Sequence, residues 1–327
     1  MQDHVPSSAM DALGLPPLRE RVFAEAEPVM VSICTITYNH AAFIRDCLEG
    51  FLDQVAPFRI EVVIYDDASD DGTSEIVREY AESHPSIFRA ILNKENLFSK
   101  GVNPYYAYVF PAAKGKYIAI CDGDDYWQDP EKLATQVRVL EDDPETSITY
   151  GRTAAEIGGR IDHDFKRGVE RDLSAMELRT CPAINTLTAC FRNPGMNAPL
   201  PYIRSAPVGD LTVWSILGRN GKGRFLPDLK PAVYRIHDGG IYSTKSSDTA
   251  YYMTMITWLS VAAHHCSAMD RASENRMLGI ASVAMADRFG LARIVWCTWL
   301  QRTKLLAHFF RKKLRQLKRS VSGITVT

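Results

Sequence analysis

Continuous apolar runs alternate with segments of helical spacing in the first half of the chain. Residues 29–36 form an apolar run that ends in polar residues, as expected of a strand buried on both faces. In residues 40–54 the apolar positions recur every three or four residues, which predicts a helix. Because strands and helices go on alternating, we expect an α/β fold with a doubly wound, mainly parallel sheet. The expected strands are 29–36, 58–66, 87–93 and 116–121, and the expected helices are 40–54, 74–84, one within 103–115, and 129–143.

The pattern becomes less regular beyond residue 144. Residues 147–157 are compatible with a pair of strands, and 186–193 and 223–237 with further strands around a helix at 210–218. From residue 248 onward the chain is expected to be mostly helical. We therefore predict a leader at 1–28, a first half at 29–143, a second half at 144–245, and a helical region at 246–327.

Polar clusters follow three of the predicted strands. They occupy residues 37–40, 66–71 and 122–125. Ligands of doubly wound sheets bind at the carboxyl ends of the strands, so the three clusters are expected to meet at one edge. This convergence predicts a functional site there.

The third cluster, in "CDGDDYW", contains three carboxylates within four residues, Asp122, Asp124 and Asp125. A turn after a strand also favours Asp and Gly, so a structural role stays open. Crowded carboxylates repel one another, and hard cations such as Mg²⁺ and Mn²⁺ take oxygen ligands, so a metal site is the alternative. Asp129 is expected to cap the next helix, with Pro130 at its first position. The segment that begins at Asp67 does not match an EF-hand calcium loop, because its twelfth position, which should be Glu, is Arg78.

Composition narrows the class of protein. The 327 residues suffice for one large domain or two moderate ones, and 46% of them are hydrophobic, as in ordinary globular proteins. A net charge of -1 argues against a general nucleic-acid binder. Seven scattered cysteines without a CxxC pair argue against a zinc site or a disulfide framework and favour a cytoplasmic location. We expect no signal peptide, and no run of 18 apolar residues that could span a membrane.

The charge is unevenly distributed. The segment from residue 288 to the end carries +10, which leaves -11 for residues 1–287. The segment 304–319 has six Lys and Arg between residues 311 and 319 among regularly spaced Leu and Phe, a pattern typical of a basic amphipathic helix. Such a helix could lie on an anionic membrane surface, at the inner face of the cell membrane, or could pack against its own domain.

Five segments together resemble a known family. They are "VSICTITYNHAAFIRDCLEGFLDQ", "EVVIYDDASDDGT", "GKYIAICDGDDYWQDPEKLATQV", "GDLTVW" and "YRIHDGGIYS". In order and spacing they are similar to family-2 glycosyltransferases with the GT-A fold, and the similarity spans residues 29–245. The nearest subgroup is the bacterial enzymes that build cell-surface polysaccharide or lipopolysaccharide. The resemblance implies a nucleotide-sugar donor, above all a UDP-sugar, and a saccharide or lipid-linked acceptor.

The resemblance also implies roles at the nucleotide end. After the first strand, Tyr38 would stack on the base, with Asn39 beside it. Asp67 would read the edge of the base, with Asp66 next to it. The first acid of the Asp-x-Asp signature, Asp122, would face the ribose.

Further roles follow at the reacting end. Asp124 would bind a divalent metal, Mn²⁺ or Mg²⁺, and His237 would complete the metal and diphosphate site. Asp125 would lie near the donor sugar, and Arg235 would contact phosphate. Asp210 would be the catalytic base. Without the family, His237 would pass for an ordinary loop histidine, and Asp210 could also cap the helix that follows it.

The expected chemistry suits these residue types. A divalent cation stabilises the negative charge that develops on a diphosphate leaving group. A carboxylate can accept the proton of the acceptor hydroxyl as that hydroxyl attacks, and one base opposite the leaving group gives inversion. Two alternatives stay open, a nucleotidyltransferase and a catalytically inactive module that binds nucleotide sugars. The first usually has a Gly-rich basic loop near its first strand, which "TITYNHAAF" lacks. Acceptor choice is expected to depend on residues 150–230 and the helical C-terminus.

Overall fold

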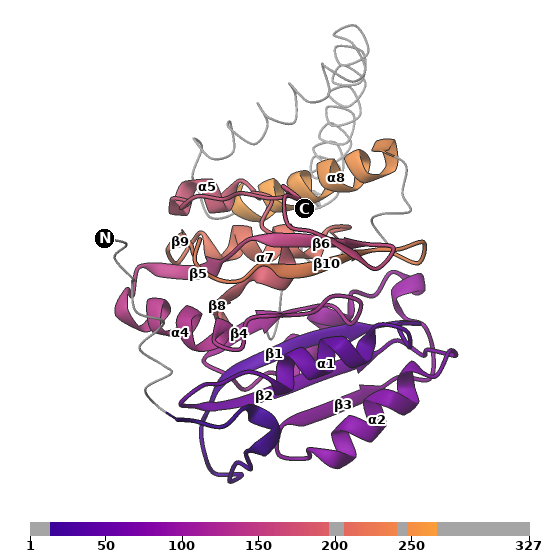
Figure 1. Cartoon of the computed structure of the whole chain (residues 1–327). Helices are drawn as coiled ribbons and strands as arrows, with labels where there is room; N and C mark the ends of the chain where they lie inside the picture. The colour runs from indigo at the N-terminus through magenta and orange to yellow at the C-terminus, as the bar shows by residue number, and fades with distance from the viewer. Residues whose placement is uncertain (1–13, 196–205, 241–246, 267–327) are drawn as a thin grey trace, which may run out of the picture. The chain divides into compact units, whose positions relative to one another are not determined.

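The computed structural model of the protein describes residues 14–195, 206–240 and 247–266 (Figure 1). The chain divides into two compact units, Met1–Ser273 and Glu274–Thr327, and every described residue belongs to the first. The predicted boundary at residue 246 therefore does not coincide with this division, because the helix that follows it is counted with the first unit. The leader before residue 14 and the basic segment 304–319 lie outside the described residues.

A seven-stranded sheet forms the centre of this unit (Figure 1). Its strand order is β3-β2-β1-β4-β8-β5-β9, and neighbours run parallel except where β8 pairs with β4 and β5. The predicted α/β class with a mainly parallel sheet is thus confirmed. The strands are β1 (Val29–Thr37), β2 (Arg59–Asp66), β3 (Phe88–Leu92), β4 (Tyr117–Ile120), β5 (Thr146–Tyr150), β8 (Cys190–Arg192) and β9 (Lys222–Phe225).

A second sheet of three strands has the order β10-β6-β7. The predicted strand pair within 147–157 does contain two strands, but each joins a different sheet. β5 pairs with β8 and β9, whereas β6 pairs with β10 and β7 after only two intervening residues. The strands of this sheet are β6 (Thr153–Ile157), β7 (Arg160–Asp162) and β10 (Ala232–Ile236).

Helices cover the central sheet and supply its core. α1 and α2 lie side by side over β1, β2 and β3 (Figure 1), and α4 packs against β5 and β8. The apolar face of α1 is buried, which explains its regular apolar spacing. The longer helices are α1 (Ile44–Leu52), α2 (Thr73–Ser83), α4 (Lys132–Asp142), α7 (Gly209–Leu217) and α8 (Ser247–Cys266). The short ones are η2 (Leu18–Glu20), η3 (Phe98–Lys100), η4 (Tyr105–Val109), α3 (Phe110–Ala112), α5 (Ala175–Arg179) and η5 (Thr186–Thr188).

The start of α4 corrects one prediction. The helix begins at Lys132 with Glu131 as its N-cap, and Asp129 and Pro130 belong to the preceding turn. The Asp129 carboxylate accepts hydrogen bonds from the backbone N–H of Glu131 at 3.1 Å and of Lys230 at 2.9 Å. Asp129 therefore ties this turn to the segment before β10 instead of capping the helix.

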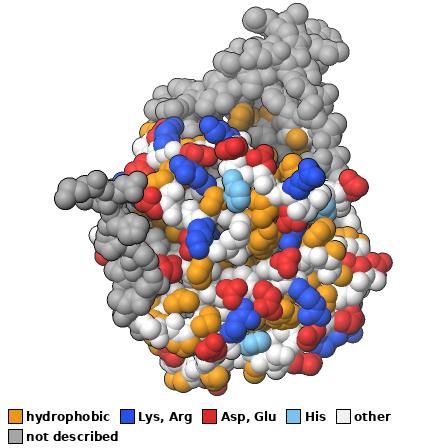
Figure 2. Space-filling view, viewed as in Figure 1, with side chains coloured by type: hydrophobic (Ala, Val, Ile, Leu, Met, Phe, Trp, Pro, Cys, Tyr) orange, Lys and Arg blue, Asp and Glu red, His pale blue; other side chains and the backbone are white. Residues whose placement is uncertain are grey.

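No helix in the described part of the chain is long and apolar enough to cross a membrane. On the face seen in Figure 2, acidic and basic side chains of the described residues are interspersed.

Candidate functional site

A cavity of about 910 Å³ opens at the carboxyl ends of β1, β2 and β4. Residues from all three predicted polar clusters line it, so the expected convergence at one sheet edge is observed. Segments from the second half of the chain complete the wall, including the start of α7 and part of α8. The volume lies within the range of pockets that enclose small-molecule ligands.

The glycine inside the acidic cluster is required by close packing. A Cβ on Gly123 would lie 2.8 Å from Oγ1 of Thr37 and 2.8 Å from Cδ1 of Ile44. The Gly123 N–H also donates to the carbonyl of Ile36 at 2.9 Å. The turn is thus held against the end of β1, which fixes where Asp122 and Asp124 project.

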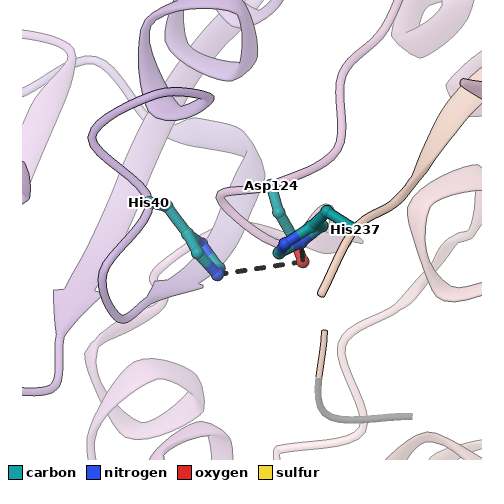
Figure 3. A group of neighbouring side chains, drawn as sticks. All are labelled: His40, Asp124 and His237. Carbon is teal, nitrogen blue, oxygen red and sulfur yellow. Dashed lines mark hydrogen bonds and ion pairs between the residues drawn. The ribbon is translucent and has the colours of Figure 1, made fainter. Parts of the chain in front are cut away.

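Asp124 lies between two histidines from distant parts of the sequence (Figure 3). Its Oδ2 is 3.2 Å from Nε2 of His237, which follows β10, and 3.8 Å from Nε2 of His40, which follows β1. One candidate ligand atom from each of the three residues lies within 4.8 Å of the other two. Burial would raise the pKa of Asp124, but the hydrogen bond from His237 and the neighbouring charge of His40 outweigh it and lower the pKa. The structure thus confirms the proximity of Asp124 and His237 and adds His40.

The two flanking acids are buried and hydrogen bonded. Asp122 accepts a hydrogen bond of 2.5 Å from the hydroxyl of Tyr105, and burial together with the charge of Asp124 raises its pKa to about 7. Asp125 accepts from the backbone N–H of Arg235 at 2.9 Å. Burial and the charge of Asp124 also raise the pKa of Asp125 well above its ordinary value.

Arg235 is placed differently from its predicted phosphate contact. It is not among the described residues that line the cavity. Its buried guanidinium donates to Glu156 at 3.1 Å and to the carbonyl of Asp124 at 3.3 Å, pairs with Asp46, and lies 4.4 Å from the ring centre of Tyr126. In this structure Arg235 holds the Asp124–Asp125 turn in place from behind the cavity wall.

Of the residues predicted for the nucleotide end, some line the cavity and others lie beside it. Tyr38 and Asp67 line the cavity, and Tyr38 is 43% exposed, leaving its ring free to meet a ligand. The Asp67 carboxylate accepts from the hydroxyl of Tyr65 and from the backbone N–H groups of Leu97 and Phe98, at 2.8–3.0 Å. Asp67 therefore also fixes the loop that leads into η3.

Two predicted residues lie beside this wall and not in it. Asp66 is fully buried and accepts hydrogen bonds from Ser69 and Ser74. Asn39 adopts a left-handed conformation with φ of 54°, and its side chain accepts from the N–H of Asp70 at 3.0 Å. Both shape the loops that carry Tyr38 and Asp67.

Asp210 is the second residue of α7 and lines the same cavity. The N-cap of α7 is Val208, so Asp210 does not cap the helix, although its Oδ1 accepts from the N–H of Leu211 at 2.8 Å. Its Oδ2 accepts from Oγ1 of Thr186 at 3.1 Å. Burial raises the pKa of Asp210. A carboxylate with a raised pKa is suited to accept a proton near neutral pH.

Several lining residues were not identified from the sequence. His40 belonged to the polar cluster 37–40, which could have pointed to it. Tyr105 comes from η4, Arg167 from an irregular segment, and Trp258 from α8, beyond the recognisable motifs. Nothing in the spacing of these three residues indicates that they share a cavity with Asp124.

The charge of the cavity wall is strongly unbalanced. Five aspartates line it, whereas Arg167 and His40 are the only basic side chains among the described lining residues. The aspartates are Asp67, Asp122, Asp124, Asp125 and Asp210. Such a wall favours a cation.

Solved structures of low sequence identity share this fold. Staphylococcus aureus TarS (residues 1–349), in complex with UDP-GlcNAc, matches with a TM-score of 0.56 at 16% identity, over 79% of this chain and 73% of that one. The mannosyltransferase PcManGT from Pyrobaculum calidifontis, in complex with GDP-Man and Mn²⁺, matches with a TM-score of 0.51 at 16% identity, over 91% and 85% of the two chains. The predicted GT-A fold is confirmed.

Curated relatives are similar to this chain over about two thirds of its length or more. An uncharacterized protein from Mycobacterium tuberculosis is 36% identical over 224 residues, which is 67% of this chain and 62% of the relative. The chain thus spans less than two thirds of that relative's length. From Escherichia coli, the UDP-Glc:alpha-D-GlcNAc-diphosphoundecaprenol beta-1,3-glucosyltransferase WfaP is 29% identical over 237 residues, 72% of this chain and 89% of the relative.

A family model gives the most direct assignment. The model described as "Glycosyl transferase family 2" matches residues 32–196. The match begins in β1, includes the three polar clusters and the Asp122–Asp125 turn, and ends just beyond β8. It covers half of the sequence, and the chain therefore belongs to glycosyl transferase family 2.

Proposed function

We propose that this chain is a metal-dependent, inverting glycosyltransferase of cell-surface glycan synthesis. It takes a sugar from a nucleotide diphosphate sugar, above all a UDP-sugar, and moves it to a hydroxyl of a saccharide or lipid-linked acceptor. The UDP-GlcNAc complex of TarS and the UDP-Glc donor and lipid-linked acceptor in the name of WfaP support this choice. The seven scattered cysteines, which favour a reducing compartment, support a cytoplasmic reaction.

The observation that carries the proposal is the acidity of the cavity. A nucleotide sugar brings a negatively charged diphosphate, and the ionised carboxylates of this wall, above all Asp124 with its lowered pKa, would repel it. The basic side chains of the described wall, Arg167 and His40, are too few to offset that repulsion. A divalent cation between carboxylate and diphosphate removes the conflict, since hard cations bind one or two carboxylates together with substrate phosphates.

The residues present fit such a cation. Asp124 and His237 would hold it, because the Asp124 oxygen and the His237 nitrogen are 3.2 Å apart and both belong to ligand types that Mn²⁺ accepts. When bound, the cation would stabilise the charge on the departing diphosphate. Arg235 keeps the Asp124 backbone in place through the hydrogen bond to its carbonyl.

The remaining roles are those that the family resemblance implies, assigned to residues that line the cavity. Tyr38 would stack on the base, Asp67 would contact its edge, and Asp122 would face the ribose. Asp125 would border the donor sugar. Asp210 would accept the proton of the acceptor hydroxyl during a single displacement that inverts the anomeric carbon.

Two other activities fit the site less well. A nucleotidyltransferase is disfavoured by membership of the glycosyltransferase family. A module that only binds nucleotide sugars has no need for a buried carboxylate with a raised pKa at the start of α7.

The test is a binding and transfer experiment on the full chain. Calorimetric titration with UDP is expected to show binding with Mn²⁺ or Mg²⁺ present and none after chelation with EDTA. A panel of nucleotide sugars should then reveal transfer or slow hydrolysis of one donor, with product configuration followed by NMR. A chain that binds neither UDP nor GDP with metal present would reject the proposal. Nucleotide transfer to a sugar phosphate would instead establish the nucleotidyltransferase.

A further inference from the structure

His40 is held beside Asp124 by its backbone. Its N–H donates to Oγ1 of Thr73 at 2.8 Å, and its carbonyl accepts from the N–H of Phe43 at 2.8 Å. The imidazole is largely buried, and Nδ1 has no hydrogen-bond partner in the described part of the chain. Nε2, at 3.8 Å from the Asp124 carboxylate, is too distant for a hydrogen bond. The buried Nδ1 is costly to leave without a partner, and Nε2, which faces the Asp124 carboxylate, is available to bind a further group.

The three side chains have the spacing of ligands around one ion. Two ligands that each lie about 2.1 Å from a metal can be at most about 4.2 Å apart. The distances of 3.2 and 3.8 Å from the Asp124 oxygen fall inside this limit. The whole group lies within 4.8 Å, so the widest gap would close with a movement of less than about 1 Å. The imidazole rings of His40 and His237 stand edge to face at 86°, both beside the Asp124 carboxylate (Figure 3).

We propose that His40 is the third protein ligand of the donor-site metal and that the site thereby selects Mn²⁺ over Mg²⁺. Mg²⁺ favours oxygen ligands and retains its water, whereas two imidazoles with one carboxylate suit first-row transition ions. An Asp-x-Asp turn alone would offer only oxygens. The inference deepens the proposed function, on which it rests only in taking the cation to bind at Asp124.

The test measures metal binding by the full chain without any nucleotide sugar. Loss of the EPR signal of free Mn²⁺ gives the affinity, and competition with Mg²⁺ gives the selectivity. His40→Ala is expected to weaken Mn²⁺ binding tenfold or more and Mg²⁺ binding less than threefold. His163→Ala is the matched control, because His163 is an exposed histidine just after β7 and should leave both affinities unchanged.

Pulsed EPR on the unaltered chain gives a readout that does not depend on folding of the variant. Two coordinated imidazole nitrogens are expected in the wild type, and one in His40→Ala. A single nitrogen in the wild type, or equal Mn²⁺ affinity with and without His40, would overturn the inference. If the chain transfers sugar at equal rates in Mg²⁺ and Mn²⁺ and shows one imidazole signal, this inference alone is rejected. Metal bound through two imidazoles without any sugar transfer rejects the proposed function alone.

A different observation concerns α8, which forms another part of the cavity wall. Met253, Thr254 and Trp258 line the cavity. The neighbouring Thr257 accepts a hydrogen bond of 3.0 Å from the N–H of Val208, the N-cap of α7. This bond ties the lining face of α8 to the start of the helix that carries Asp210.

Trp258 has a buried indole N–H without a partner among the described residues. Trp214 shares this property, but it is fully buried in the core and does not line the cavity, whereas Trp258 does. A sugar ring offers an apolar face to the indole and a hydroxyl oxygen to the N–H. A hydrocarbon chain offers no acceptor, so a lipid tail would leave the N–H unsatisfied.

We infer that Trp258 forms the platform for the acceptor sugar next to Asp210. This inference also rests on the proposed function, since it assigns the occupant of the acceptor end of the same cavity. The α8 helix lies beyond the matched family segment, so acceptor choice would be set by a part of the chain that the shared motifs do not include.

The test uses NMR of ¹⁵N-labelled indole groups in the full chain with UDP and Mg²⁺. Probes are the methyl glycosides of glucose, galactose, mannose and N-acetylglucosamine, with cyclohexane as the hydrocarbon probe that has no hydrogen-bond acceptor. At least one glycoside is expected to shift the Trp258 signal, which is identified by its absence in Trp258→Phe. Saturation-transfer titrations should show about fivefold weaker glycoside binding in Trp258→Phe, because one hydrogen bond is lost, and at least about tenfold weaker binding in Trp258→Ala.

Leu259→Ala serves as the control, since Leu259 is 47% exposed on the same helix and does not line the cavity. UDP affinity should stay within twofold in all three variants. A Trp258 signal that moves with cyclohexane and with no glycoside would overturn the inference, as would unchanged glycoside binding in Trp258→Ala. Failure of the wild type to bind UDP would reject the proposed function instead.

Discussion

At the scale of single residues, the acidic turn contains side chains with separate tasks. Asp124 meets two histidines, Asp122 meets Tyr105, and Asp125 is held by the backbone of Arg235. The sequence could predict that Asp124 and His237 meet, because both belong to motifs of fixed order. It could not predict that the Arg235 side chain points away from the cavity, because that depends on Asp46 and Glu156 from other elements.

The substitution Asp210→Asn tests whether Asp210 acts as the catalytic base. Asparagine keeps the size of the side chain but cannot accept a proton, so transfer should fall about 100-fold or more. UDP binding should stay within twofold of the wild type. In the wild type the acid limb of kcat/KM should lie above the ordinary Asp range, because burial raises the pKa of Asp210 and activity requires its ionised form. Steady-state kinetics across pH would measure both effects.

The matched control is Asp228→Asn, at an exposed carboxylate outside the cavity. It should leave the rate and the pH profile unchanged. Full activity in Asp210→Asn would remove Asp210 from the mechanism.

Gly123→Ala tests the packing of the acidic turn. The new Cβ would meet Thr37 and Ile44 at 2.8 Å, so the turn must shift, at a cost of about 1–3 kcal/mol in the free energy of unfolding. The shift should also weaken metal-dependent UDP binding, since Asp122 and Asp124 move with it. Urea denaturation and calorimetry would measure the two effects.

Gly151→Ala is the control for this substitution. A Cβ there meets its nearest neighbour, Leu229, at 3.5 Å, which is ordinary contact, so stability and binding should be nearly unchanged. Equal stability of the two variants would contradict the packing argument.

At the scale of elements, the apolar patterns predicted most strands and helices to within a few residues. β1, β2 and α2 follow directly from their runs, because local spacing determines which face is buried. The division of β5 and β6 between two sheets could not be predicted, since it depends on pairing with the distant β9 and β10. The start of α4 was misplaced for the same reason, because Asp129 bonds to the distant Lys230.

α4 also carries a buried cation with a measurable effect on stability. The Lys132 ammonium donates to Oε1 of Gln136 at 2.7 Å and lies 4.1 Å from the ring centre of Trp127. Burial lowers its pKa to about 8 from the 10.5 of an unperturbed lysine. Between these values the unfolded chain binds more protons, so the contribution of Lys132 to stability rises with pH and is lost as pH falls through about 8.

Lys132→Met isolates this contribution, because other buried groups titrate alike in both proteins. The free energy of unfolding of the wild type minus that of Lys132→Met should increase between pH 8 and pH 10, by at most about 3 kcal/mol. Urea denaturation at several pH values would measure it. A difference that stays constant across this range would contradict the lowered pKa of Lys132.

At the scale of the whole molecule, our proposals assign most of the donor site and the acceptor site to different parts of the chain. The family match at 32–196 contains the Asp122–Asp125 turn, whereas Asp210, His237 and α8 come later. Fixed motifs made the first part predictable from the sequence. The acceptor side could be predicted only as a region, because its wall is assembled from segments without a recurring pattern.

The basic segment 304–319 bears on where the protein acts. Its structure lies outside the described residues, but its six Lys and Arg between residues 311 and 319, among spaced Leu and Phe, predict a basic amphipathic helix that could lie on an anionic membrane surface. A lipid-linked acceptor would be reached most readily by an enzyme held at that surface. Each basic residue near an anionic surface contributes about 1 kcal/mol, so the attraction should be strong at low salt and screened at high salt.

Cosedimentation with vesicles tests this prediction. The full chain should pellet with phosphatidylglycerol-containing vesicles and not with pure phosphatidylcholine vesicles, and binding should fall as salt is raised. Deletion of residues 303–327 should abolish it, and so should replacement of the six basic residues by Gln in the chain of full length, because the charges are then gone although the apolar face remains. UDP binding is the control for folding of both variants. If the Gln variant still pellets, charge does not drive the association, and if the full chain stays in solution with both kinds of vesicle, the segment packs within the protein instead.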